Sequence, residues 1–257
     1  MDLGIAGRTA VVCASTSGLG EATARALAAE GARVAVCGRR GDLAGKIAAE
    51  LPGAIGVEVD LTQPGGPAAL ASAALAAFGR VDILVLNSPG PPPGGSTDID
   101  DVAITKAMES LVLPHQRLVA RLLPGMRERG WGRILALASV GVVAPIPSLA
   151  LSNIGRAALG GYLKTLANEV ARDGVTVNLL LPGRIATART AAMNTYRAAR
   201  EGVDVEEFAA RAQAAIPVGR FGRPEEFGAV AAFLCGQPAS YITGTAVRCD
   251  GGSVPTL

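Results

Sequence analysis

The sequence predicts an α/β fold, a single domain in which helices cover both faces of one doubly wound, parallel sheet of about seven strands. Short aliphatic runs alternate along the chain with longer Ala- and Leu-rich stretches, which is the pattern of repeated βαβ units. The aliphatic runs lack polar alternation, as do strands that are buried on both faces. Hydrophobic residues make up 49% of the 257 residues and aromatic residues only 4%, so we expect closely packed helices and one domain spanning residues 1–257.

The elements can be placed by their residues. We expect strands at residues 9–14, 33–37, 54–59, 81–86, 133–138, 175–180 and 245–248. We expect helices at residues 19–30, 42–51, 67–78, 101–129, 149–172, 205–215 and 224–235. Two further segments, residues 87–97 and 185–218, follow the carboxyl ends of strands, where open α/β sheets bind ligands. We expect both segments to bind ligands, and residues 185–218 to act as a lid over a substrate.

Charge and cysteine content exclude several classes of partner. The net charge is +2 and no basic block occurs, so we expect neither nucleic acid nor an anionic membrane as a partner. The four cysteines are isolated, which predicts no metal site and no disulfide, and fits a reducing cytoplasm. Residues 134–155 carry no charge and reach membrane-spanning length, but Pro145, Pro147 and Asn153 interrupt them. We interpret this stretch as a strand, a loop and the start of a helix.

The first predicted strand runs into a glycine-containing turn at Ser15-Thr16-Ser17-Gly18-Leu19-Gly20. Glycines at such a turn let the backbone approach a pyrophosphate, and the helix that follows offers unpaired N–H groups and the positive end of its dipole. Two glycines alone are a weak signal, because many such turns merely join a strand to a helix. The position after the first strand of a βαβ series favours a dinucleotide site.

The second predicted strand ends at Arg39 and Arg40, where an NAD-binding fold usually carries an acid for the ribose 2′-hydroxyl. Guanidinium groups at this point are suited to a 2′-phosphate, so NADP is favoured over NAD. The alternative is that both arginines belong to a solvated turn. Asp60, at the end of the third strand, is suited to accept an N–H of adenine, or else it caps the turn at Thr62.

Along its whole length the sequence resembles the short-chain dehydrogenase/reductase family, most nearly its 3-oxoacyl-carrier-protein reductase-like members. The family's first turn, T-G-x-x-x-G-x-G, is matched with Ala14 in place of its first glycine. Further segments resemble the family in order along the chain: Asn87-Ser88-Pro89-Gly90, Asn178, Pro182-Gly183-Arg184-Ile185-Ala186-Thr187, Arg220-Phe221-Gly222-Arg223-Pro224-Glu225-Glu226, and Tyr241-Ile242-Thr243-Gly244 with Asp250-Gly251-Gly252.

The resemblance implies a Rossmann-type fold and an NADP(H)-dependent oxidoreductase that acts on a small carbonyl or alcohol substrate. It also implies a homotetramer or homodimer, with the helices at residues 101–129 and 149–172 at an interface. The cofactor-binding residues expected on this basis are Ser15, Ser17, Gly18, Leu19, Gly20, Arg39, Arg40, Asp60, Leu61, Asn87, Gly90, Pro182, Gly183, Ile185 and Thr187.

The catalytic segment departs from the family. Members use a Ser after the fifth strand, a Tyr thirteen residues later in Y-x-x-x-K, and often an Asn on the preceding helix. Here Ser139 is present, but Ser152 stands at the Tyr position, Arg156 at the Lys position and Leu111 at the Asn position. We therefore expect Ser139, Ser152 and Arg156 to be the catalytic candidates, and to converge beside Asn87 and Pro182.

These replacements remove the usual proton donor. A Tyr beside a Lys has its pKa drawn down from about 10 toward neutrality, whereas a Ser hydroxyl is a far weaker acid and an Arg stays protonated. Ser152 and Arg156 still share one helical face, so the site keeps a positive charge and a hydroxyl. Tyr196 and His115 are weaker candidates for the missing acid. The alternative is that Tyr196 is a packing or surface tyrosine and His115 an interior or interface histidine. Tyr162 is out of reach, because it lies about 15 Å farther along the helix.

Three functions remain open from the sequence. The first is an NADP(H)-dependent oxidoreductase with an altered site. The second is a catalytically disabled NADP-binding member of the family. The third is non-redox chemistry on the same fold, of a lyase, isomerase or dehalogenase-like kind, in which Arg156 holds an anion. The intact dinucleotide segments favour the first two.

Overall fold

Seven parallel strands form the sheet in the computed structural model, which describes residues 1–256. They are β1 Thr9–Val12, β2 Arg33–Gly38, β3 Ile55–Glu58, β4 Ile83–Leu86, β5 Gly132–Leu137, β6 Val175–Pro182 and β7 Ala246–Cys249. Their order is β3-β2-β1-β4-β5-β6-β7. The predicted parallel, doubly wound sheet is confirmed, and each predicted strand is found with small shifts at its ends.

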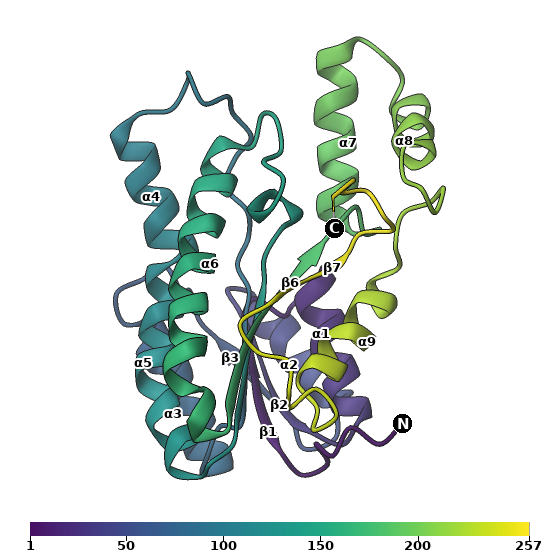
Figure 1. The fold of residues 1–257 in the computed structure, drawn as a ribbon. Helices are drawn as coiled ribbons and strands as arrows, with labels where there is room; N and C mark the ends of the chain where they lie inside the picture. The colour runs from purple at the N-terminus through teal and green to yellow at the C-terminus, as the bar shows by residue number, and fades with distance from the viewer. Residues whose placement is uncertain (257) are drawn as a thin grey trace.

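Helices cover both faces of this sheet (Figure 1). One face carries α3 Gly66–Phe78, α4 Asp101–Leu111, α5 Leu113–Glu128 and α6 Ala150–Val170. The other face carries α1 Gly18–Ala29, α2 Gly41–Ala49 and α9 Pro224–Leu234. Two further helices, α7 Ala188–Glu201 and α8 Val205–Ala214, project beyond the carboxyl ends of the strands.

The order in which strands are added to the sheet reverses between β1 and β4. β1 pairs with β2 on one side and with β4 on the other, so the chain winds outward from β1 in one direction and then, from β4 onward, in the other. Ligands of doubly wound sheets bind beyond the carboxyl ends of the strands at such a point. The residues that follow β1, β2 and β4 are therefore placed where such a ligand would bind.

Helix α1 packs closely on α9, although the two are distant in sequence. Gly228 of α9 lies so near α1 that a Cβ on it would sit 2.7 Å from the Ala22 carbonyl oxygen. The buried face of α1 includes Ala24 and Leu27, and α9 contributes Phe227 to the same core. The first helix of the fold is thus covered by the last one.

The structure corrects two expectations about helices. The single helix predicted at residues 101–129 is two helices, because the chain breaks at Val112, two residues before Pro114. Proline lacks an N–H and restricts the residue before it, so a helix readily restarts there. The segment 185–218 contains α7 as well as the predicted short helix, and is more ordered than the loop that its polar composition suggested.

The uncharged stretch at residues 134–155 folds, as predicted, into a strand, a loop and the start of a helix. It contains β5, a 3₁₀ turn Val140–Val142, a loop and the start of α6. Within residues 1–256, none of the helices has both the length and the apolar character needed to cross a bilayer.

A buried ion cluster lies at the amino edge of the sheet. Asp82, which is fully buried just before β4, accepts a hydrogen bond from the Thr9 backbone N–H at 3.1 Å. Three guanidinium groups surround its carboxylate, at 3.1 Å from Arg80, 3.5 Å from Arg129 and 3.8 Å from Arg8. The cluster ties the starts of β1 and β4 to the end of α5.

Candidate active site

The turn after β1 is held to β2 by one side chain. The Ser15 hydroxyl donates to the Val12 carbonyl at 2.6 Å and accepts from the Cys37 N–H at 2.9 Å. The N-cap residue of α1, Ser17, makes no capping hydrogen bond within the described chain, so its side chain leaves the first N–H groups of the helix uncapped. Helix N-termini in this state bind phosphate groups.

Glycine at position 20 is required by close packing. A Cβ there would lie 2.4 Å from the Ala14 carbonyl oxygen and 2.8 Å from Asn87 Nδ2. The Asn87 amide in turn donates to the same carbonyl at 3.2 Å, so the loops after β1 and β4 meet at this point. The crevice predicted from the sheet order is therefore lined by residues that the sequence singled out.

Ala14 has a left-handed backbone conformation, with φ of +46°. This conformation is disfavoured by about 1–2 kcal/mol for residues that carry a Cβ, whereas glycine adopts it freely. The position is the one at which the family carries the first glycine of its turn. The backbone has kept the turn although the side chain has changed.

The two arginines after β2 behave differently. Arg40 donates to the carbonyl and hydroxyl oxygens of Thr16, both at 3.2 Å, and so braces the turn after β1. The exposed Arg39 side chain has no hydrogen bond to any described residue, and it contributes to lowering the pKa of Asp60. The larger causes of that lowering are the hydrogen bonds that the Asp60 carboxylate accepts from the Thr62 hydroxyl at 2.7 Å and the Thr62 N–H at 2.9 Å. Asp60 thus caps the turn, as the alternative interpretation has it.

Arg156 is a buried cation that contacts neutral oxygens. Its Nη1 donates to the Leu137 carbonyl at 3.0 Å, its Nε to the Ser152 hydroxyl at 3.3 Å, and its Nη2 lies 3.5 Å from the Ser88 carbonyl. The side chain is only 9% exposed, and it forms no ion pair with a described carboxylate. Burial and the nearby Arg189 lower the pKa of Arg156 to about 10, which leaves it protonated at neutral pH.

Of the three catalytic candidates, the structure brings Ser152 and Arg156 into direct contact. Ser139 lies two residues beyond the Leu137 carbonyl that Arg156 contacts, but its hydroxyl accepts a hydrogen bond from the Gly141 N–H at 3.0 Å. That bond uses a lone pair and leaves the hydroxyl proton free to donate. The Ser88 hydroxyl nearby is buried and has no partner among residues 1–256.

His115 is enclosed in the interior near this site. Its ring nitrogens lie 2.9 Å from the Leu111 carbonyl and 3.3 Å from the Asn87 carbonyl, and the residue is 1% exposed. Burial is the main cause that lowers the pKa of His115 to about 4, with a smaller contribution from the charge of Arg156. A neutral ring carries one N–H, so at neutral pH His115 can donate to only one of these two carbonyls.

The two tyrosines named by the sequence lie outside this arrangement. Tyr196 is an exposed residue of α7, and its hydroxyl accepts a hydrogen bond from Arg200 at 3.1 Å. Tyr162 packs partly buried farther along α6, against the core.

Helix α7 closes the site from the side of β6. Thr187 caps this helix, and its methyl group would lie 3.6 Å from a Cβ on Gly18, so the segment after β6 reaches the start of α1. Gly183 packs against Asp250, where a Cβ would lie 2.6 Å from the Asp250 Cα. Ile185 is buried and forms a bridge to Gly222, while Pro182 ends β6.

Two residues of the site were missed by the sequence reasoning, Arg189 and Ser88. Arg189 of α7 donates to the carbonyls of Gly90 and Pro91, both at 3.2 Å, and so ties α7 to the loop after β4. The sequence places it two residues after Thr187, but nothing in the sequence indicates which side of a helix it occupies. Leu19, in the turn after β1, and Leu61, after β3, are partly buried and pack against the two cores.

Comparison with known proteins agrees with this geometry. The family model described as Enoyl-(Acyl carrier protein) reductase matches residues 13–254. "Dehydrogenase/reductase SDR family member 4" of Bos taurus is 34% identical over 97% of this chain and 88% of its own, and "Putative ketoacyl reductase" of Streptomyces coelicolor is 33% identical over 95% of each. The L-sorbose reductase of Gluconobacter frateurii, solved with NADPH and L-sorbose, is 34% identical and superposes with a TM-score of 0.94 over 100% of both chains.

Proposed function

This chain belongs to the short-chain dehydrogenase/reductase family, and from that premise we propose that it is an NADP(H)-dependent oxidoreductase acting on a carbonyl or alcohol substrate of the 3-oxoacyl type. In this proposal Ser152 and Arg156 replace the Tyr and Lys of the family. The observation that carries the proposal is the joint presence of the uncapped N-terminus of α1 and a buried guanidinium without a counter-ion, both at the carboxyl edge of the sheet.

The residues present fit a dinucleotide phosphate. The uncapped start of α1 suits the pyrophosphate, while Arg39 suits a 2′-phosphate. We assign the nicotinamide end to the loops after β4 and β6, with the residues Asn87, Gly90, Pro182, Gly183, Ile185 and Thr187. NADPH, when bound, supplies a hydride to the carbonyl carbon. The L-sorbose reductase relative, which was solved with NADPH, supports this choice of cofactor.

The chain's own residues then have distinct roles. Arg156 stabilises the negative charge that develops on the substrate oxygen, because a fixed guanidinium in a water-poor site is an effective electrostatic partner. Ser152 orients Arg156, and the Ser139 hydroxyl is free to donate a hydrogen bond to the same substrate oxygen. None of these groups is an acid at neutral pH, so the proton for the oxygen comes from water.

A second function is favoured by the same observation. His115, the titratable group nearest to neutrality in water, is buried, with its pKa at about 4, and no tyrosine contacts Arg156. A family member that binds NADP(H) without turnover would have this arrangement, and its Arg156 would hold an anionic ligand.

NADPH and NADH titrations test the cofactor part of the proposal. We expect NADPH to bind more tightly, and Arg39→Asp to weaken NADPH by about 10- to 100-fold while leaving NADH nearly unchanged. Lys46→Asp, an exposed charge reversal on α2, is the matched control and should leave both affinities close to wild type. Equal losses for the two cofactors in Arg39→Asp would remove the argument for NADP.

Turnover on a panel of ketones, 3-oxoesters and alcohols separates the two functions. Oxidation of NADPH that depends on the substrate supports the oxidoreductase. Tight NADPH binding without turnover on any member of the panel supports the second function.

We also expect a homo-oligomer that uses the helices on one face of the sheet. Val102 of α4, Leu113 of α5 and Ile154 of α6 are large apolar residues that remain exposed in the monomer. Light scattering on the purified protein gives the mass directly, and a monomer at micromolar concentration would contradict this expectation.

A further inference from the structure

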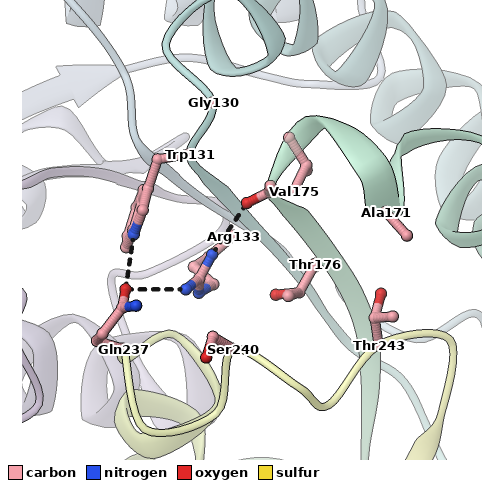
Figure 2. Close-up of a pocket in the computed structure, with 10 residues that line it drawn as sticks. Gly130, Trp131, Arg133, Ala171, Val175, Thr176, Gln237, Ser240 and Thr243 are labelled. Carbon is pink, nitrogen blue, oxygen red and sulfur yellow. Dashed lines mark hydrogen bonds between the residues drawn. The ribbon is translucent and has the colours of Figure 1, made fainter.

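A polar hollow lies at the opposite edge of the sheet from the candidate active site. It has a volume of about 170 Å³ and lies between the starts of β5 and β6 and the loop that follows α9 (Figure 2). Arg133 and Thr176 face it from neighbouring strands, where they are paired in register. Ser240 and Thr243 face it from the loop.

Two buried polar groups in this hollow are not fully satisfied. Arg133 is 2% exposed, and its N–H groups donate to the carbonyls of Gly132, Gly174 and Gly236 and to the Gln237 side chain. These four bonds leave one of its five N–H groups without a partner among residues 1–256, and all four acceptors are uncharged. Thr176 is 5% exposed, and its hydroxyl has no hydrogen-bond partner in the described chain.

The charge of Arg133 is also uncompensated. Burial, together with the charge of Arg8, lowers the pKa of Arg133, and no described carboxylate forms an ion pair with it. Arg8 also lies against the Trp131 ring, 3.9 Å from its centre, with Arg133 at 4.3 Å. The Arg8 guanidinium lies 3.8 Å from the Asp82 carboxylate, whereas Arg133 has no such partner among the described residues, so an anion beside Arg133 would balance its charge.

We propose that this hollow is a binding site for a small oxyanion of the phosphate type, held by Arg133 and Thr176 with help from the hydroxyls of Ser240 and Thr243. An oxyanion can accept hydrogen bonds from the remaining N–H of Arg133 and from hydroxyl groups that approach from different directions. It would therefore provide a partner for both unsatisfied groups, Arg133 and Thr176. The volume is below the roughly 300–1,000 Å³ of sites for larger ligands. A small oxyanion therefore fits the hollow better than a nucleoside does.

The molecule carries its own reporter for this site. Trp131 is the single tryptophan of the chain, and its indole N–H donates to Gln237 Oε1 at 3.0 Å. The same oxygen accepts from Arg133 Nη2 at 3.4 Å. A ligand that draws on Arg133 therefore changes the environment of one indole N–H, which gives a single resonance in a ¹⁵N-correlated NMR spectrum.

The experiment is a titration of inorganic phosphate into the full-length protein, with sodium chloride at matched ionic strength as the reference. We expect a saturable shift of the indole resonance in phosphate and none in chloride. Thr176→Val, which keeps the shape of the side chain, should weaken phosphate by about tenfold or more. Thr165→Val is the matched control, because the Thr165 hydroxyl is on the exposed side of α6, and it should titrate like wild type.

Two further variants keep the outcome decisive. Ser240→Ala changes an exposed loop residue, so it preserves the fold and should weaken phosphate several-fold even if Thr176→Val is poorly folded. Arg39→Asp should leave the indole titration unchanged, because the cofactor's phosphate site is at the other edge of the sheet. A shift that does not saturate, that chloride reproduces, or that Thr176→Val and Ser240→Ala leave intact would overturn the proposal.

Discussion

Asp82 and Arg156 are buried charges at opposite edges of the same sheet, and the chain treats them in opposite ways. Three guanidinium groups surround the Asp82 carboxylate, which also accepts from the Thr9 backbone. Arg156 has only carbonyl and hydroxyl oxygens around it, and a second cation, Arg189, close enough to lower its pKa. Removing one partner of a buried charge is costly, so a cation without a counter-ion marks a place where a ligand supplies the negative charge.

The largest expected effect comes from restoring the family's proton donor at the unpaired cation. Ser152→Tyr with Arg156→Lys should raise turnover with simple ketones by about 10²–10⁴-fold, the usual contribution of general acid catalysis. Natural turnover with these ketones should be very low. Steady-state NADPH oxidation measures both, and the pair should outperform either single change, because the longer, planar Arg misplaces a tyrosine hydroxyl.

The same experiment has a clear negative outcome. Brisk natural turnover that is lost in Ser152→Ala would show that this serine already takes part in the chemistry. The interpretation that this site lacks a proton donor would then be wrong.

The next effect is at the paired charge. Asp82→Asn leaves three guanidinium groups around a neutral amide, and should lower the free energy of unfolding by about 3–5 kcal/mol. Urea denaturation measures the loss. Asp173→Asn removes the surface partner of Arg127 and should cost less than about 1 kcal/mol, so it serves as the control. An equally small loss of unfolding free energy in both variants would show that the buried cluster at Asp82 contributes no more than a surface ion pair.

His115 shows a third treatment, in which a buried titratable group is kept neutral. Its pKa is about 4 in the folded chain and about 6.5 when unfolded, so the unfolded state binds the proton more readily between these values. Stability is therefore fully present above pH 6.5 and is lost as the pH falls toward 4, by about 3 kcal/mol. His115→Gln should remove this part of the pH dependence, as urea midpoints at pH 4.5 and 7 would show; an unchanged slope would contradict the assignment.

The smallest effect concerns backbone strain at the carboxyl edge. Ala14→Gly should stabilise the protein by up to about 1 kcal/mol, because relief of the left-handed strain is partly offset by the greater freedom of glycine when unfolded. Ala10→Gly in β1 provides the comparison, since it gains no such relief and should destabilise. Thermal unfolding of the two variants measures the difference, and a less stable Ala14→Gly would show that the turn is unstrained.

Most of the sheet is predictable from the sequence, and the reason is burial on both faces. The residues of β1 and β4 are buried without exception, so uninterrupted apolar runs such as Ile83–Leu86 identify strands without any need for alternation. The glycine turn is also readable, because the close packing at Gly20 leaves no room for a side chain. Helix α7 was missed because its many Ala and Arg residues give a polar average, although these residues favour helix.

The candidate site is less predictable, because it depends on contacts between distant segments. Spacing places Ser152 and Arg156 on one face of α6, and the structure shows them in contact. Spacing gives no sign that Arg189 approaches from α7 or that Ser88 lies beside Arg156. The same holds for Arg133, whose surroundings come from β6 and from the loop after α9.

The packing of α1 on α9 also has a consequence for synthesis on the ribosome. Helix α1 ends at Ala29, whereas α9, which covers it, begins only at Pro224. A nascent chain therefore presents the apolar side of α1, with Ala24 and Leu27, until nearly all of the protein has been made. Such long-range closure slows folding and leaves apolar surface open to aggregation. Translation of this chain thus has a long vulnerable interval, during which chaperones have a surface to bind.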